Sequence, residues 1–182
     1  MQSIANTTST TPTDELERSI LLFFVQQKRR SVRPEELFDM FRRYKPYLVM
    51  KAVVNLCEQD YLIILNDAMI EINNYPLLIQ YFMRFKRIAT AYLLYFLIVQ
   101  NRTKIRTRSK AVFTYDMFFA PRMIESTHIV EVITFVLNKR NKKLFHAKDE
   151  LLERGILIKE SNRHYIFNYE KIDPMLLDFL TG

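Results

Sequence analysis

The sequence predicts a mainly α fold with short β-hairpins, arranged as one or two winged-helix-like units. Three observations support this: apolar residues recur at helical spacing, two apolar runs flank Asn66-Asp67, and glycine is scarce. Only Gly155 and Gly182 occur. Because glycine alone readily supplies positive φ and close backbone approach, phosphate loops and dinucleotide-binding turns built on it are excluded before Gly155.

The N-terminal part is predicted to be a flexible tail followed by a winged-helix-like unit at 14–75. The tail, residues 1–13, is rich in Ser, Thr and Asn, and Thr13 is expected to cap the first helix. Ser31 is expected to cap the second, with Pro34 in its first turn. The predicted elements are helices at 14–27, 32–45 and 47–59 and hairpin strands at 61–65 and 68–72.

Residues 76–182 are predicted to form a second helical unit that ends in a helix and a hairpin. Gly155 is expected to be the C′ residue of the helix before that hairpin. The basic stretch at 101–110 is expected to be a loop or an exposed strand, and the aromatic segment 113–119 to pack on the core. The other predicted elements are a break at 73–76, helices at 77–84, 85–100, 126–137 and 143–154, and hairpin strands at 156–158 and 165–167.

Composition indicates a soluble protein with an anionic partner. The formal net charge is +7, which favours nucleic acid, an acidic protein or a membrane surface, although solubility alone also explains it. The longest apolar run, 88–99, is too short to span a membrane, and the N-terminus does not resemble a signal peptide. The single cysteine, Cys57, cannot form an internal disulfide and fits a reducing compartment.

No catalytic or metal-binding motif is visible. The three histidines, at 128, 146 and 164, are scattered and lack zinc-ligand spacing. Asp149, Glu150 and Glu153 are expected to lie on an exposed, ion-paired helix face. The sequence therefore predicts a protein that is not an enzyme and that needs no cofactor or metal.

Clusters of Lys and Arg are the candidate nucleic-acid contacts, because each cation placed on a phosphate releases a condensed counterion. In an extended chain, the alternating cations of 104–110 would all point to one side. The third predicted helix offers only Lys51, Asn55 and Gln59 to a DNA groove, so the first unit is also a candidate protein-binding unit. The candidate contacts are Arg29, Arg30, Arg33, Arg42, Arg43, Lys104, Arg106, Arg108, Lys110, Lys139, Arg140, Lys142 and Lys143.

Four short segments, in this order and spacing, resemble subunit 1 of the snRNA-activating protein complex. They are Ser31-Val32-Arg33 followed by Glu36 and Phe41-Arg42; Ala91-Tyr92-Leu93-Leu94-Tyr95; Lys104-Ile105-Arg106; and Leu144-Phe145-His146 followed by Leu151-Leu152. The resemblance implies a nuclear, non-enzymatic subunit of a complex that binds small nuclear RNA promoters. It implies that Arg33, Arg42, Lys104 and Arg106 occupy shared positions, whereas the hairpin at 61–72 departs from the family.

The expected function is therefore that of a nuclear subunit of a promoter-binding complex. It is expected to contact double-stranded promoter DNA and other subunits of the complex, and not to bind a membrane. Two alternatives stay open. One is a tandem winged-helix subunit of a replication or telomere complex. The other is a pure protein scaffold whose basic clusters meet acidic partners.

Overall fold

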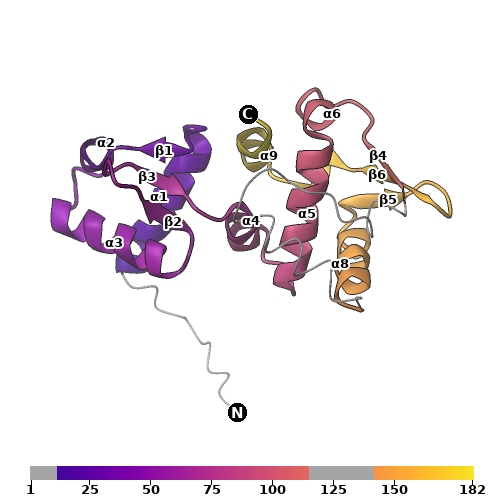
Figure 1. Cartoon of the computed structure of the whole chain (residues 1–182), viewed down its shortest axis with the longest axis horizontal. Helices are drawn as coiled ribbons and strands as arrows, with labels where there is room; N and C mark the ends of the chain where they lie inside the picture. The colour runs from indigo at the N-terminus through magenta and orange to yellow at the C-terminus, as the bar shows by residue number, and fades with distance from the viewer. Residues whose placement is uncertain (1–11, 115–141) are drawn as a thin grey trace, which may run out of the picture. The chain divides into compact units, whose positions relative to one another are not determined.

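The computed structural model describes residues 12–114 and 142–182, and the chain divides into two compact units, Met1–Asn73 and Asn74–Gly182 (Figure 1). Helices predominate in the described part of both units. Each unit also contains a small antiparallel sheet of three strands. The prediction of a mainly α fold with short β-hairpins is therefore confirmed.

Unit 1 combines three helices with one sheet. Its elements, in chain order, are α1 (Pro12–Gln26), β1 (Ser31–Val32), α2 (Pro34–Met40), α3 (Pro46–Glu58), β2 (Leu62–Ile64) and β3 (Ile70–Ile72). β3 is the central strand, between β1 and β2. α1 packs against α3, and fully buried side chains from helices and strands form one core. These side chains include Ile20, Phe24, Val32, Leu37, Val53 and Ile70.

Two predicted caps in unit 1 are wrong, because prolines begin the helices. α1 starts at Pro12, one residue before Thr13, and α2 starts at Pro34. Proline suits the first helical turn, where its missing N–H costs no hydrogen bond and its φ is already helical. Ser31 belongs to β1 and lies opposite Glu71, so the backbone there is extended.

Unit 2 is built around one buried helix. Its described elements are α4 (Tyr75–Met83), α5 (Ile88–Gln100), α6 (Arg102–Arg106), β4 (Val112–Thr114), α8 (Lys142–Glu153), β5 (Leu157–Lys159), β6 (His164–Phe167), the 3₁₀ turn η2 (Tyr169–Lys171) and α9 (Pro174–Thr181). Nine of the 13 residues of α5 are buried, and α4 and α8 pack against it (Figure 1). A helix that is apolar all round is expected at such a central place.

The predicted C′ glycine and the second hairpin are present. Gly155 has φ +67°, its N–H bonds to Leu152 O at 2.9 Å, and the N–H of Ile156 bonds to Leu151 O at 2.9 Å. This pair of bonds is a Schellman motif, which closes α8. Strands β5 and β6 follow it, as predicted. The sequence pattern did not predict β4, which pairs with the side of β6 opposite to β5.

The predicted break at 73–76 is shorter than expected, because α4 begins at Tyr75 and only Asn73 and Asn74 separate it from β3. The Asn74 side chain accepts a hydrogen bond from the N–H of Leu77 at 3.1 Å and caps α4, with Pro76 in the first turn. An asparagine followed by proline two residues later marks a helix start, so the helix begins two residues before the predicted position 77. The predicted helix at 126–137 and the aromatic residues 115–119 lie outside the described residues. Phe113, just before them, is fully buried, as expected.

Candidate nucleic-acid interface

The basic charge of the chain is concentrated in unit 2. Unit 1 contains 9 Lys and Arg against 10 Asp and Glu, a formal net charge of −1. Unit 2 contains 18 Lys and Arg against 10 Asp and Glu, a net charge of +8. A polyanion is therefore attracted to unit 2 and not to unit 1.

The alternating cations of residues 104–110 do not lie on one side, so that prediction is wrong. Residues 102–106 form α6, in which side chains two positions apart point about 200° apart. Ile105 explains the helix: its side chain is fully buried and its N–H bonds to Asn101 O at 2.9 Å. Burying this one apolar side chain within a helical turn directs Lys104 and Arg106 outward, and both are exposed.

Two cations of the basic stretch at 101–110 bind the C-terminal helix, α9. Arg102 donates from Nε to Thr181 O at 3.0 Å and from Nη2 to Gly182 O. Arg108 forms an ion pair with Asp178 at 2.8 Å, and its guanidinium carbon lies 5.6 Å from the centroid of the Tyr169 ring. Arg108, predicted as a nucleic-acid contact, thus has an internal role in packing α6 against α9.

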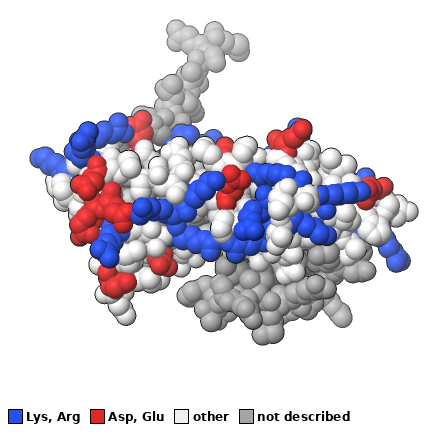
Figure 2. Space-filling view, turned by 90° about the horizontal axis from the view of Figure 1, so that it is seen from above, with Lys and Arg blue, Asp and Glu red and all other residues white. Residues whose placement is uncertain are grey.

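The remaining cations of the stretch are open to solvent. Lys104 and Arg106 make no ion pair within the part of the chain that the structure describes. Lys110 pairs with Glu160, but both side chains are exposed, and such a pair contributes only about 0–1 kcal/mol. Viewed from above, where α6 faces the reader, Lys and Arg side chains gather over this part of unit 2 (Figure 2).

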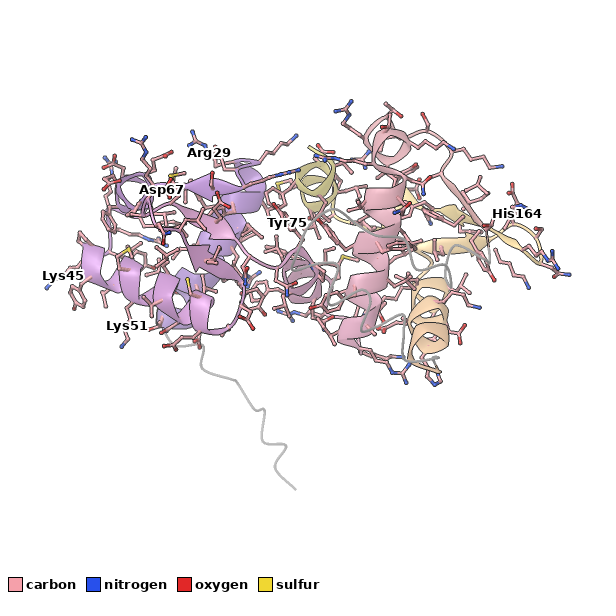
Figure 3. The ribbon with its side chains drawn as sticks, in the orientation of Figure 1. Arg29, Lys45, Lys51, Asp67, Tyr75 and His164 are labelled. Carbon is pink, nitrogen blue, oxygen red and sulfur yellow. The ribbon has the colours of Figure 1, made fainter. Side chains whose placement is uncertain are left out.

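The β5–β6 hairpin adds cations that the sequence analysis did not single out. Lys159 and Arg163 are exposed near its turn, and the Lys110–Glu160 pair connects the hairpin to the end of the basic stretch. His164 is exposed at the same end of unit 2 (Figure 3), where its Nδ1 lies 2.9 Å from Ser161 Oγ. The available signal was the hairpin prediction itself, which places the residues around 160–164 at a solvent-exposed turn.

Two of the candidate cations of unit 1 contact neighbouring side chains. Arg29 pairs with Glu36, whereas the guanidinium carbon of Arg43 lies 4.9 Å from the centroid of the Tyr44 ring. Arg29 projects near β1, away from the Lys45 and Lys51 side chains of the α3 region (Figure 3). Arg29 is therefore not clustered with these two lysines. The remaining candidates of this unit, Arg30, Arg33 and Arg42, are exposed.

The exposed face of α3 is apolar more than basic. Tyr47 is 64% exposed and Val54 is 44% exposed, with Lys51 between them. Asn55, predicted to face a DNA groove, instead donates to Glu17 of α1 at 2.9 Å. An apolar stripe with a single cation suits a protein partner better than a phosphate backbone.

The cluster at 139–143 is only partly described. Lys139 and Arg140 lie outside the described residues. Lys142 and Lys143 begin α8, but only their backbone is described. The structure therefore does not test these four contacts.

Glu150 is buried, so the prediction of an exposed acidic face on α8 is wrong at this residue. It is 3% exposed, and its carboxylate accepts the backbone N–H of Lys86 and the hydroxyl of Thr90, both at 2.6 Å. Arg154 Nε lies 3.5 Å away. Burial alone would raise the pKa of Glu150, but these hydrogen bonds and the charges of Arg154 and Lys86 hold it below the ordinary value of 4.5. Glu150 is thus an ionised clamp between α8 and the start of α5.

Among the described residues there is no cluster of metal ligands, no reactive cysteine and no membrane-spanning helix. They contain no group of three or more His, Cys, Asp or Glu that could hold a metal ion. Burial raises the pKa of the Cys57 thiol, which makes that side chain a poor nucleophile at neutral pH. No helix among the described residues is long and apolar enough to cross a membrane.

Comparison with known proteins gives no relative: no family profile, no curated protein and no solved structure matches the chain.

Proposed function

We propose that the chain is a non-enzymatic subunit that binds nucleic acid through unit 2 and a protein partner through unit 1. The observation that carries this proposal is the separation of charge, −1 in unit 1 and +8 in unit 2. Cations without internal partners are the groups most readily placed on phosphates, since no existing ion pair must be broken. Within the described residues Lys104 and Arg106 are such groups, and Lys110 can exchange its exposed pair with Glu160 for a phosphate.

The proposal is tested by neutralising Lys104 and Arg106 together. Binding of a fluorescent duplex to the full chain is measured by anisotropy between about 50 and 200 mM salt, the range over which phosphate contacts weaken strongly. The double variant Lys104→Gln/Arg106→Gln is expected to bind more weakly at every salt concentration. Its slope of log K against log salt should fall by roughly 1.8, or about 0.9 per lost contact.

Unit 1 provides the matched control. The double variant Lys45→Gln/Lys51→Gln removes the same two charges from exposed positions of unit 1. It should leave the salt slope close to that of the wild type. Equal losses in both double variants would mean that net charge alone attracts the duplex, and absence of wild-type binding at about 50 mM salt would overturn the proposal.

We interpret unit 1 as a winged-helix-like unit used for protein binding. The order α1, β1, α2, α3, β2, β3 supports this interpretation, since three helices and a hairpin form a variant of the helix-turn-helix. In DNA-binding members of that class, the helix that enters the groove presents polar and basic groups to the bases. Here the corresponding face of α3 presents Tyr47 and Val54.

The resemblance to subunit 1 of the snRNA-activating protein complex refines the proposal to a nuclear, promoter-binding complex. Arg33, Arg42, Lys104 and Arg106 belong to the resembling segments, and all four side chains are exposed. The test is affinity purification of the tagged chain from nuclear extract with mass spectrometry. Recovery of promoter-binding subunits together with RNA polymerase factors would support the refinement.

The two alternatives predict different outcomes of the same purification. Replication or telomere proteins in the purified complex would replace the promoter assignment and leave nucleic-acid binding intact. A scaffold with no nucleic-acid role would retain protein partners while the isolated chain fails to bind duplex. The exposed Tyr47 and Val54 favour a protein-binding function for unit 1, and they do not bear on the function of unit 2.

A further inference from the structure

We propose that two copies of this chain associate through β2, the open edge of the unit 1 sheet. In the strand order β1-β3-β2, formed by the described residues of unit 1, β2 has a partner strand on one side only. A strand in this position presents backbone N–H and C=O groups that can pair with another strand. The inference is independent of nucleic-acid binding, because it concerns a different unit and different residues.

The hydrogen-bond register identifies the outward backbone groups. Leu65 donates to Met69 O at 2.8 Å, and Tyr61 accepts from the N–H of Asn73 at 2.9 Å. In an antiparallel ladder, residues alternate between bonding one neighbour strand and facing the other side. The odd-numbered residues of β2 therefore bond β3, so the N–H and C=O groups of Leu62 and Ile64 face the open edge.

The side chains of β2 carry no charge, whereas charged side chains on an edge strand usually prevent its pairing with other strands. Ile63, Ile64 and Leu65 are consecutive and are 37%, 42% and 37% exposed. Natural proteins commonly guard exposed edges with charged residues, especially Lys. The outer strand β5 of unit 2 has such a guard, since Lys159 and Glu160 directly follow its exposed Ile158.

A second copy of β2 fits this edge in one self-complementary register. If Leu62 of each copy pairs with Ile64 of the other, the outward groups form four N–H···O bonds and two sheets become one of six strands. Ile63 then lies opposite Ile63 of the second copy, on the two-fold axis. The flanking pairs in this register are Tyr61 with Leu65, Asp60 with Asn66, and Gln59 with Asp67.

Electrostatics favour a second copy over a charged partner. No two like charges lie opposite each other in this register, and like charges directly opposite would destabilise the pairing. Unit 1 carries a net charge of only −1, so repulsion between the two paired units is weak, and salt screens the additional repulsion between the cationic unit 2 of each chain. The pairing would also cover Ile63 and Leu65 of both copies, which are otherwise exposed.

Sedimentation of the full chain tests the association. From about 1 μM to about 1 mM protein, the mass is expected to rise from 21.9 kDa toward twice that value. Ile64→Pro removes an outward N–H that makes no bond within the sheet, so the unit should fold and stay monomeric. Lys159→Pro is the matched control at an outward position of β5, and it should leave the association unchanged.

A cysteine placed on the proposed two-fold axis tests the register itself. In a Cys57→Ala background, Ile63→Cys should form a disulfide-linked dimer under mild oxidation, because directly opposed non-hydrogen-bonded residues lie about 4.5 Å apart at Cα. Ile158→Cys in the same background should not. A monomer at every concentration, an association that survives Ile64→Pro, or equal cross-linking at both cysteines would overturn the proposal.

Discussion

Glu150 contacts three groups, the Lys86 N–H, the Thr90 hydroxyl and the Arg154 guanidinium, although the sequence analysis places it in solvent. We predict that Glu150→Gln destabilises the protein by about 1–3 kcal/mol, because the amide NH₂ group cannot accept both the Lys86 N–H and the Thr90 hydroxyl. Urea unfolding measures the change. Glu153→Gln is the control, since Glu153 is exposed and its pair with Lys86 is long, at 3.4 Å. Equal effects of the two variants would contradict the assignment of Glu150 as the carboxylate that holds α8 against the start of α5.

The same carboxylate makes stability depend on pH. The pKa of Glu150 is lower in the folded chain than its ordinary value of 4.5, so its stabilisation is fully present above about pH 4.5. It is lost as the pH falls through the lower, folded pKa. Unfolding midpoints measured from neutral pH down to about pH 3 should therefore fall less steeply for Glu150→Gln than for the wild type. Parallel curves would show that this side chain carries no such linkage.

Single residues also show how far the candidate interface can be predicted. The concentration of cations at 104–110 is visible in the sequence, but the partner of each cation in the folded chain is not. Arg108 pairs with Asp178, 70 positions away, and Lys110 with Glu160, 50 positions away. Glu150 is likewise buried by groups 60 and 64 positions away. No local pattern contains such tertiary partners.

At the scale of elements, the end of α8 depends on one backbone conformation. We predict that Gly155→Ala lowers the free energy of unfolding by about 1–2 kcal/mol, because φ is +67° there. A Cβ would lie 3.5 Å from Lys171 Cε, an ordinary contact, so the cost comes from the backbone and not from a clash. Thermal or urea unfolding checks it, and a neutral or stabilising substitution would contradict the assignment of the Schellman motif.

Helices and hairpins were more predictable than isolated strands. α3 and the two hairpins follow from local apolar spacing and turn residues, all within a few positions of each other. β1 has two residues and β4 has three, and their partners Ile70 and Ile166 are distant in sequence. α6 was missed because alternating cations suggested an extended chain, whereas one buried side chain, Ile105, sets the helical conformation.

At the scale of the whole molecule, each unit has a buried core of its own. We predict that Leu56→Ala, at a 1% exposed position, destabilises unit 1 by about 2–5 kcal/mol. Hydrogen exchange followed by mass spectrometry should show faster exchange in α1 and α3, with protection of α5 unchanged. The reciprocal variant Leu97→Ala should affect α5 and spare α3. Loss of protection in both units from either substitution would show that they unfold as one.

The unequal charge of the two units has a consequence for how the chain meets any anionic material. A molecule whose charge is distributed evenly adsorbs in many orientations, but this one has a near-neutral part and a strongly cationic part joined at Asn73–Asn74. On a cation-exchange resin or an anionic vesicle, unit 2 should supply most of the electrostatic attachment. The bulk isoelectric point of about 9.5 is therefore an average over two unlike halves, and immobilisation on such a surface is expected to hold the chain through unit 2.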